Sequence, residues 1–168
     1  FMKTPFVTKE RLESIAAQYP TPFHIYDEKG IRENARRLKA AFAWNPGFRE
    51  YFAVKATPTP AILKILHEEG CGCDCSSLAE LALAEGCGIT GEAGVMFSSN
   101  NTTEEEFQAA CRLGGIINLD DVTLIDTLTK AVGRVPEKIC CRYNPGGVFT
   151  LGESRDGVQV MDTPGDAK

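Results

Sequence analysis

The stretch EYFAVKATPTP, residues 50–60, carries one lysine, Lys55, in an apolar run that is followed at once by two prolines. The run predicts a buried strand over 50–55 that ends on the lysine, because proline cannot continue a strand ladder. Burial among apolar side chains lowers the pKa of a lysine and frees its amine to act as a nucleophile. The alternative is a lysine whose ammonium reaches past the strand end into water.

Downstream of Lys55 the chain alternates short apolar runs with amphipathic segments. The pattern predicts strands over 71–75, 94–98, 115–119 and 138–143, and helices over 59–69, 77–86, 103–113 and 121–132. Glycines 70, 86, 114 and 133 fall at helix ends, where a left-handed cap is favoured. Such an alternation is typical of parallel βαβ units and of an α/β fold.

Upstream, the sequence predicts a helix over 8–19 capped by Thr8, a short strand over 21–27 and a helix over 28–43. Residues 1–49 are therefore interpreted as N-terminal helices and a strand that lead into the main domain, which covers 50–168. The stretch 144–168 differs from the rest, since it is rich in Gly, Pro and Asp and contains no predicted helix.

Polar residues follow the apolar part of each predicted strand, and this placement distinguishes two kinds of α/β fold. They are Lys55, Asp74, Ser98, Asn118 and Arg142. A (β/α)8 TIM-type barrel gathers its functional side chains at these strand ends, whereas the Gly-x-Gly-x-x-Gly motif of dinucleotide-binding folds is missing. The sequence therefore predicts a TIM-type barrel, and 168 residues against the roughly 250 of a whole barrel predict that about the first half is present.

Side-chain alternation sorts each predicted strand into two faces. One face carries the polar set, and the other carries the cysteines of the 71–75 strand. The polar set consists of Tyr51, Ala53 and Lys55 on the first strand, Gly72, Asp74 and Ser76 on the second, and Cys140, Arg142 and Asn144 on the fifth. If this face lines the barrel interior, Lys55, Asp74 and Arg142 converge; the sequence leaves open which face is inside.

Seven cysteines, an odd number, favour free thiols in a reducing compartment over a disulfide framework. The run Cys71-Gly72-Cys73-Asp74-Cys75 lacks the spacing of a structural zinc site, and His24 and His67 are isolated, so no metal site is predicted. A net charge of −5 disfavours nucleic acid as a partner. No apolar run approaches the roughly 20 residues of a membrane span, and a cytoplasmic location is expected.

The lysine strand and six further segments resemble the fold-type III pyridoxal-phosphate-dependent amino acid decarboxylases, with diaminopimelate decarboxylases the most similar group. In chain order the further segments are residues 21–27, 73–81, 97–102 and 117–120, the Arg142-Tyr143-Asn144-Pro145-Gly146 run, and Asp166-Ala167-Lys168. The segment 97–102 departs from the family pattern, because Ser99 stands where glycine is usual and Thr102 where lysine is usual.

The resemblance implies that Lys55 holds pyridoxal 5'-phosphate (PLP) covalently. It further implies that Ala53 lies beside the cofactor ring, Asp74 near the attachment point and Arg142 near the polar edge of the cofactor. The expected reaction is decarboxylation of an amino acid, first of all meso-diaminopimelate to L-lysine and CO2 in lysine biosynthesis. The expected full-length protein is a homodimer with shared active sites, and the rest of the barrel and a C-terminal β domain are expected outside this sequence, so that the chain alone turns over little substrate.

Other activities within the same fold remain open. Carboxynorspermidine, ornithine and arginine decarboxylases carry their substrate-selecting residues outside this stretch. Alanine racemase has a Val-Lys-Ala strand too, but the residues after Ala56 are Thr57-Pro58-Thr59-Pro60 instead of the racemase continuation. A barrel that binds the cofactor without catalysis is a further alternative.

Overall fold

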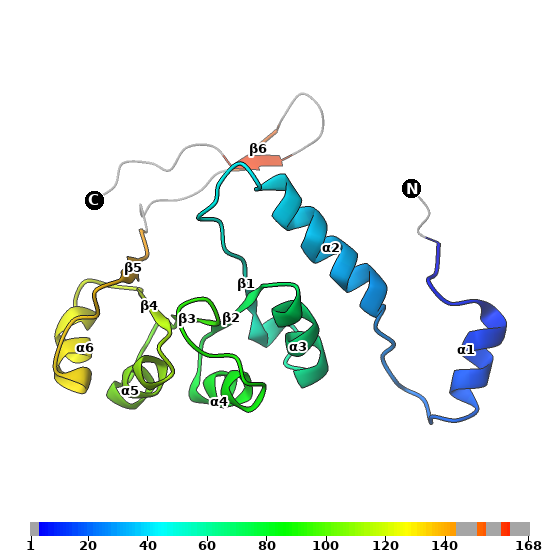
Figure 1. The fold of residues 1–168 in the computed structure, drawn as a ribbon, viewed down its shortest axis with the longest axis horizontal. Coiled ribbons are helices and arrows are strands. Elements are labelled where there is room, and N and C mark those ends of the chain that lie inside the picture. Colours follow the sequence, from blue (N-terminus) through cyan, green and yellow to red (C-terminus); the bar gives the residue numbers. More distant parts are fainter. Residues whose placement is uncertain (1–3, 144–150, 154–158, 162–168) are drawn as a thin grey trace.

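The computed structural model describes residues 4–143, 151–153 and 159–161. Its centre is a parallel sheet of five strands whose spatial order, β1-β2-β3-β4-β5, is the order of the sequence (Figure 1). Four helices, α3 to α6, follow the first four strands in turn and lie along the same side of this sheet (Figure 1). Neighbouring strands that are also consecutive in the chain are the arrangement of a TIM-type barrel, and the predicted α/β class is confirmed.

The elements after residue 50 agree with the predicted ones to within a few residues at each end. The strands are β1 (Tyr51–Ala53), β2 (Gly72–Cys75), β3 (Val95–Ser98), β4 (Ile116–Leu119) and β5 (Ile139–Cys141). The helices are α3 (Pro60–Glu68), α4 (Leu78–Gly86), α5 (Glu104–Arg112) and α6 (Leu124–Val132). A short antiparallel pair, β6 (Leu151–Glu153) and β7 (Gln159–Met161), falls in the predicted irregular stretch 144–168, whose other residues lie outside the described part.

The predicted lysine strand over 50–55 is too long. Strand β1 ends at Ala53, which pairs with Asp74, and the chain then enters a 3-10 helix, η1 (Val54–Ala56). The backbone N–H of Thr57 donates to the carbonyl of Val54 at 3.1 Å and closes this turn. Pro58 and Pro60 lack the N–H groups that a longer strand needs, so the turn is the available continuation.

The N-terminal segment holds two helices, α1 (Lys9–Ala16) and α2 (Glu28–Ala41). Thr8 caps α1 as predicted, and its hydroxyl accepts a hydrogen bond from the N–H of Arg11. Helix α1 buries none of its residues, and Leu12 is 43% exposed. The predicted strand over 21–27 is wrong, because these residues join no ladder within the part of the chain that the structure describes.

The core lies between the sheet and its helices. Its largest fully buried side chains include Phe97 from β3, Phe107 from α5 and Leu81 from α4. Burying a side chain of this size contributes about 1.5–3 kcal/mol. Cys73 and Cys75 point into the same layer, at 2% and 0% exposure, so the thiols of β2 act as small core side chains.

Three of the four predicted glycine caps are confirmed. Gly70, Gly114 and Gly133 have φ of 84°, 72° and 75°, in the left-handed region that glycine adopts without strain. Gly86 is the exception, since it is the last residue of α4 and the left-handed position falls on Gly88 instead.

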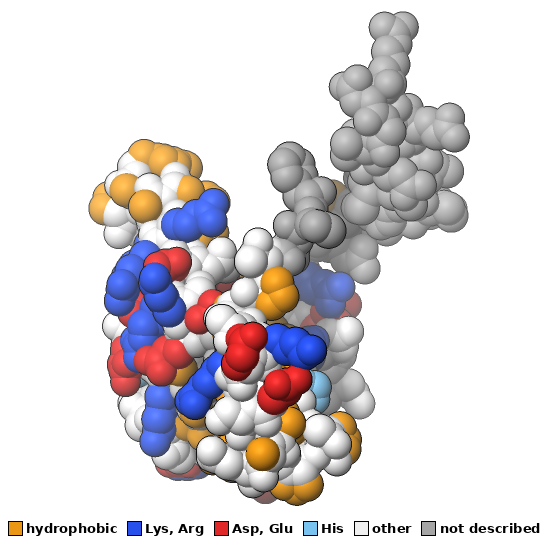
Figure 2. Space-filling model, turned by 90° about the vertical axis from the view of Figure 1, so that its right-hand side faces the viewer, with side chains coloured by type: hydrophobic (Ala, Val, Ile, Leu, Met, Phe, Trp, Pro, Cys, Tyr) orange, Lys and Arg blue, Asp and Glu red, His pale blue; other side chains and the backbone are white. Residues whose placement is uncertain are grey.

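Helix α2 attaches to α3 through charged side chains. Arg32 donates to Glu28, Glu68 and Glu69, and Arg36 donates to both carboxylate oxygens of Glu69. Figure 2 views this end of the molecule and shows acidic and basic side chains intermixed on the surface. The helices are thus held by paired charges of both signs.

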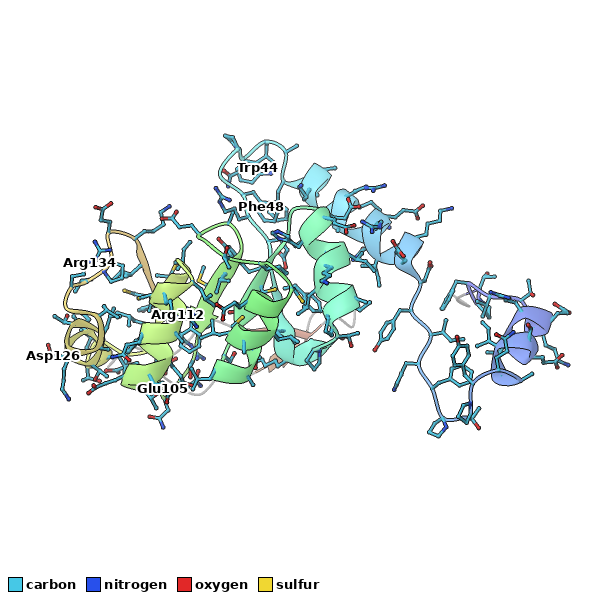
Figure 3. All side chains as sticks on the ribbon, turned by 60° about the horizontal axis from the view of Figure 1, so that its bottom comes forward. Trp44, Phe48, Glu105, Arg112, Asp126 and Arg134 are labelled. Carbon is cyan, nitrogen blue, oxygen red and sulfur yellow. The ribbon has the colours of Figure 1, made fainter. Side chains whose placement is uncertain are left out.

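Aromatic side chains gather in the loop between α2 and β1. The rings of Phe42 and Phe48 stack with centroids 4.2 Å apart, while Trp44 is 77% exposed (Figure 3).

None of the helices in the described part of the chain has the length and apolar character that crossing a membrane requires.

Candidate cofactor site on the open face of the sheet

The predicted polar face of the sheet is the face turned away from the helices. On this face Ala53 stands beside Asp74, and Asp74 beside Met96, as direct register partners. One step further along the strands, Ser98 pairs with Asn118 and Asn118 with Cys140. The strands alternate as expected, because Cys73, Cys75, Val95 and Phe97 are buried on the opposite face against the helices. The polar face of the sheet is therefore the face that lines the interior of a barrel, a point that the sequence alone did not decide.

Lys55 lies in η1, immediately after β1, and is exposed. The predicted burial of this lysine is wrong for this chain. The 3-10 turn carries the residue past the end of the strand, and a five-stranded sheet covers it from one side, whereas a closed barrel surrounds its inner face. The amine is consequently open to an incoming molecule.

Asp74 projects from β2 beside Lys55. Its Oδ1 atom is buried and has no hydrogen-bond partner among the described residues. Burial raises the pKa of Asp74, while the nearby Ser98 hydroxyl and the positive charge of Lys55 oppose the rise and the charge of Glu80 adds to it. Buried polar atoms are almost always paired, so a bare carboxylate oxygen next to an amine indicates a place for a polar group of a ligand.

Ser98 and Asn118 continue this row across the sheet. The Asn118 Nδ2 donates to the Ser98 Oγ at 3.1 Å. The sequence marked both as strand-end polar residues but did not single them out as site residues. Their placement near the carboxyl ends of adjacent strands, Ser98 at the last position of β3 and Asn118 at the third position of β4, is the signal that could have found the pair.

Glu80 supports the same edge from α4. Its carboxylate accepts from the backbone N–H of Ser76 at 2.9 Å, and its own N–H donates to the Ser77 hydroxyl that caps the helix. This reciprocal bonding fixes the turn between Asp74 and α4. In the turn between β3 and α5, Thr102 stands where the family pattern usually has lysine. Its side chain is 6% exposed, and its hydroxyl donates to the carbonyl of Ser99 at 3.4 Å.

Arg142 does not join Lys55 and Asp74 in this structure. It follows β5, and β3 and β4 separate it from Asp74 in the sheet. Its guanidinium donates to Asp120 at 2.8 Å and to Asn100 at 3.3 Å. The predicted convergence of three residues thus holds for two of them, because in an open sheet strands β2 and β5 do not face each other across a closed interior.

No group of three or more His, Cys, Asp or Glu side chains among the described residues is arranged to hold a metal ion. The polar residues of the open face are an amine, a carboxylate, a hydroxyl and an amide. They sit at the carboxyl ends of parallel strands, where barrel enzymes carry their active sites. The fold and this face define a barrel-type α/β domain with an exposed lysine, Lys55, immediately after its first strand.

The family model for the pyridoxal binding domain of pyridoxal-dependent decarboxylases matches residues 28–151. The chain belongs to this family. The cofactor is PLP, and the residues present fit it: the exposed primary amine of Lys55 suits covalent attachment, and the unpaired Asp74 Oδ1 leaves an acceptor beside it.

Two curated relatives illustrate the similarity. Protein TabA of Pseudomonas amygdali pv. tabaci is 42% identical over 148 residues, which cover 88% of this chain and 34% of the relative. A diaminopimelate decarboxylase of Methanothermobacter thermautotrophicus is 35% identical over 134 residues, covering 78% of this chain and 30% of the relative. The chain therefore spans about a third of the length of the curated relatives that it matches.

Two solved structures share the fold. SrLDC in complex with PLP and cadaverine superposes with a TM-score of 0.68 at 26% identity, covering 79% of this chain and 34% of that one. Diaminopimelate decarboxylase from Helicobacter pylori, complexed with L-lysine, gives a TM-score of 0.63 at 26% identity and covers 71% and 30% of the two chains. The TIM-type barrel of fold-type III is thereby confirmed as the fold to which these five strands belong.

Proposed function

We propose that this chain supplies the lysine-bearing part of the active site of a PLP-dependent amino acid decarboxylase. The observation that carries the proposal is the neighbouring placement of the exposed Lys55 and the half-buried Asp74, with its bare Oδ1, within the segment matched by the pyridoxal binding domain. A catalytically silent barrel has no need to keep an uncompensated buried carboxylate oxygen beside an amine.

In this proposal Lys55 attaches the cofactor through its primary amine, which can both form the bond and be displaced by the amine of the substrate. When bound, PLP supplies an electron sink for the electron pair released as the substrate carboxylate leaves as CO2. Asp74 holds a negative charge near the attachment point, and Ala53 leaves room for the ring on the same face. Arg142 is proposed to contact the polar edge of the cofactor, for which its pairing with Asp120 must open or shift.

The proposed substrate is meso-diaminopimelate, and the product is L-lysine with CO2. Support comes from several relatives named diaminopimelate decarboxylase, including one 36% identical over 139 residues from Zymomonas mobilis. The second candidate is a decarboxylase of the polyamine type, acting on ornithine, arginine or carboxynorspermidine. The likeness to SrLDC, which was solved with the diamine cadaverine, favours keeping this candidate.

Cofactor attachment is tested directly on the chain. PLP is added, the adduct is reduced with borohydride, and the modified lysine is located by mass spectrometry. We expect modification at Lys55, and no specific site in Lys55→Ala. Lys64→Ala, which removes an exposed lysine from α3, is the matched control and should behave as wild type. Equal labelling of all exposed lysines would contradict the proposal.

Substrate choice is tested on the longer protein that carries this sequence. CO2 release is measured with meso-diaminopimelate, ornithine, arginine and carboxynorspermidine in parallel, with Lys55→Ala as the inactive control. Release from diaminopimelate alone supports the first candidate, and release from a polyamine precursor supports the second. A protein that attaches PLP but releases no CO2 from any of these four substrates would be a barrel that binds the cofactor without catalysis.

We also propose that the full-length protein is a cytoplasmic homodimer, as the resemblance implies. Sedimentation equilibrium of that protein at several concentrations should give twice the monomer mass. A monomer that retains full decarboxylase activity would contradict a shared active site.

A further inference from the structure

The side chain of Arg142 links three loops at the carboxyl edge of the sheet. Its Nη1 atom donates to Asp120 Oδ1 at 2.8 Å and to Asn100 Oδ1 at 3.3 Å. Asp120 follows β4 and Asn100 follows β3, so one guanidinium nitrogen of a residue that follows β5 joins the ends of three neighbouring strands. Asn100 and Asp120 are called the acceptor pair of Arg142 below.

The backbone places Arg142 on the inner face of the sheet. Its N–H donates to the carbonyl of Leu119 at 2.8 Å, which extends the β4–β5 ladder one residue beyond the end of β5. Cys140 is the register partner of Asn118 on the inner face, and Arg142 stands two residues further along. Alternate residues of a strand share a face, so the contacts between Arg142 and the acceptor pair lie on the side that carries the candidate cofactor site.

The contact between Arg142 and Asp120 is an ion pair of modest strength. Their side chains are 51% and 26% exposed, so water screens the attraction between the two charges. Exposed pairs of this kind change an equilibrium constant by about two- to fivefold. Asn100 adds a neutral acceptor at a longer distance. Since a guanidinium binds phosphate and carboxylate oxygens in the same way, another anionic group can replace Asp120 at this modest cost.

We propose that Asp120 sets the affinity for the cofactor by competing with its anionic oxygens for the guanidinium of Arg142. The inference rests on the proposed contact between Arg142 and the polar edge of the cofactor. Binding then exchanges one anionic partner of Arg142 for another, and the free energy of the Arg142–Asp120 pair is subtracted from that of the new contact. Asn100, which is neutral, competes more weakly.

The test measures the PLP affinity of the longer protein that carries this sequence, by titration of the protein with PLP and absorption of the bound cofactor. Asp120→Asn should raise the affinity about two- to fivefold, because the charged competitor for Arg142 is removed. Asn100→Asp, which adds a second carboxylate beside Arg142, should lower the affinity by a similar factor. Both effects should disappear in the Arg142→Gln background, because the competition acts through the guanidinium.

Asp121→Asn is the matched control. It removes the same charge from the next residue, whose carboxylate accepts from Thr123 instead of Arg142. Its affinity for PLP should change less than that of Asp120→Asn. Damage to the fold at Asp120 would weaken binding, so a gain in affinity separates competition from a structural role. An unchanged or lower affinity in Asp120→Asn, or an equal gain in Asp121→Asn, overturns the proposal.

Pyridoxal, which lacks the phosphate, separates two sources of anionic oxygen on the cofactor. A gain in Asp120→Asn that is kept with pyridoxal assigns the competition to the ring oxygen. A gain that is seen with PLP and lost with pyridoxal assigns it to the phosphate.

The ion pair is also measured without PLP, by NMR of the Arg142 guanidinium. Its rotation should be slow in wild type and in Asp121→Asn, and faster in Asp120→Asn, because the acceptor pair holds Nη1. Equal rotation in wild type and Asp120→Asn overturns the competition. If wild type binds no PLP, the proposed function is overturned instead, and the rotation still decides whether Asp120 holds Arg142.

Discussion

Asp74 has its pKa raised by burial, and this makes the stability of the chain depend on pH in a defined direction. A carboxyl whose folded pKa lies above its unfolded value binds more protons in the folded state. Its contribution favours folding at low pH and is lost as the pH rises through the folded pKa, because ionising it then opposes folding. Lys55 and Ser98 reduce this effect without removing it.

Replacing Asp74 by Asn should therefore raise the urea midpoint of the chain at pH 7 relative to wild type, and change it less at pH 3.5. The amide keeps the shape of the carboxyl without the charge that burial disfavours. Equilibrium unfolding followed by circular dichroism at both pH values measures the difference. Glu137→Gln, at an exposed position, should show no such pH-dependent gain. A loss of stability at pH 7 in Asp74→Asn would show that the charge is well paired.

The cysteines of β2 should resist alkylation in the folded chain. Burial raises the pKa of Cys73 to about 11 and that of Cys75 to about 12, with neighbouring thiols adding to the rise. The thiolate is the reactive form, so iodoacetamide at pH 8 should modify the exposed Cys141 at least about a hundredfold faster than either of them. Peptide mass spectrometry over time measures the rates. Equal rates in the native chain, as expected in urea, would mean that β2 opens readily.

Among the elements, the contact between β1 and β2 depends on the absence of a side chain at Gly72. A Cβ at this position would lie 2.5 Å from Cδ1 and 2.8 Å from Cε1 of Tyr51, and 2.9 Å from the carbonyl oxygen of Ala93. The Tyr51 hydroxyl is held by the carbonyl of Glu92, so the ring cannot move aside freely. The absence of a side chain at Gly72 therefore leaves room for the Tyr51 ring on the inner face of the sheet, at the amino ends of β1 and β2.

Gly72→Ala should accordingly destabilise the chain by about 1–3 kcal/mol, the usual cost of forced overpacking. Chemical unfolding measures the loss, and Tyr51→Ala in the same chain should recover part of it by vacating the space. Gly86→Ala is a matched control, since apart from its chain neighbours and its own helix backbone no atom lies within 4 Å of its Cβ position, and alanine favours a helix. A neutral Gly72→Ala would mean that the two strands adjust without cost.

Helix α2 should loosen from α3 in acid. The guanidinium of Arg36 lowers the pKa of Glu69 by hydrogen bonding, and Arg32 lowers it further. A depressed carboxyl pKa stabilises the fold above the unfolded value of 4.5, and this stabilisation is lost as the pH falls through the folded pKa. Amide hydrogen exchange of residues 28–41 should therefore speed up below about pH 4.5 relative to α5.

Glu69→Gln should show the faster exchange of α2 already at pH 7, because the amide no longer pairs with two arginines. Glu33→Gln, which removes only an exposed pair with Lys29, should not. Raising the salt concentration should act on wild type in the direction of Glu69→Gln, since salt screens exposed charges. Identical exchange in all these states would indicate that apolar packing alone holds α2.

For the molecule as a whole, periodicity and punctuation predicted the alternating strands and helices from 50 to 141 within a few residues. These signals are local, and each unit buries one face against the next, so the local pattern and the fold agree. The side of the sheet that carries the polar set followed from its packing: Cys73 and Cys75 are buried under the helices, and Asp74 is on the other face.

The errors arose where a residue depends on elements distant in sequence. Burial of Lys55 and convergence of Arg142 both require strands that close the cylinder, and no local signal at residue 55 or 142 contains them. The segment 21–27 has the composition of a strand but lacks a ladder partner in the described residues. Pairing of Asn118 with Ser98 depended on a register that strand boundaries alone did not fix.

The exposure of Trp44, in the loop that also holds Phe42 and Phe48, has a consequence for measuring unfolding by fluorescence. Trp44 is the one tryptophan of the chain and is 77% exposed, so its indole already experiences water in the native state. The emission maximum of Trp44 should shift little to longer wavelength on denaturation, so its fluorescence is a poor measure of core unfolding. Because the indole is exposed in the native state, its fluorescence should become more intense or shift to shorter wavelength when another molecule covers that end of the protein.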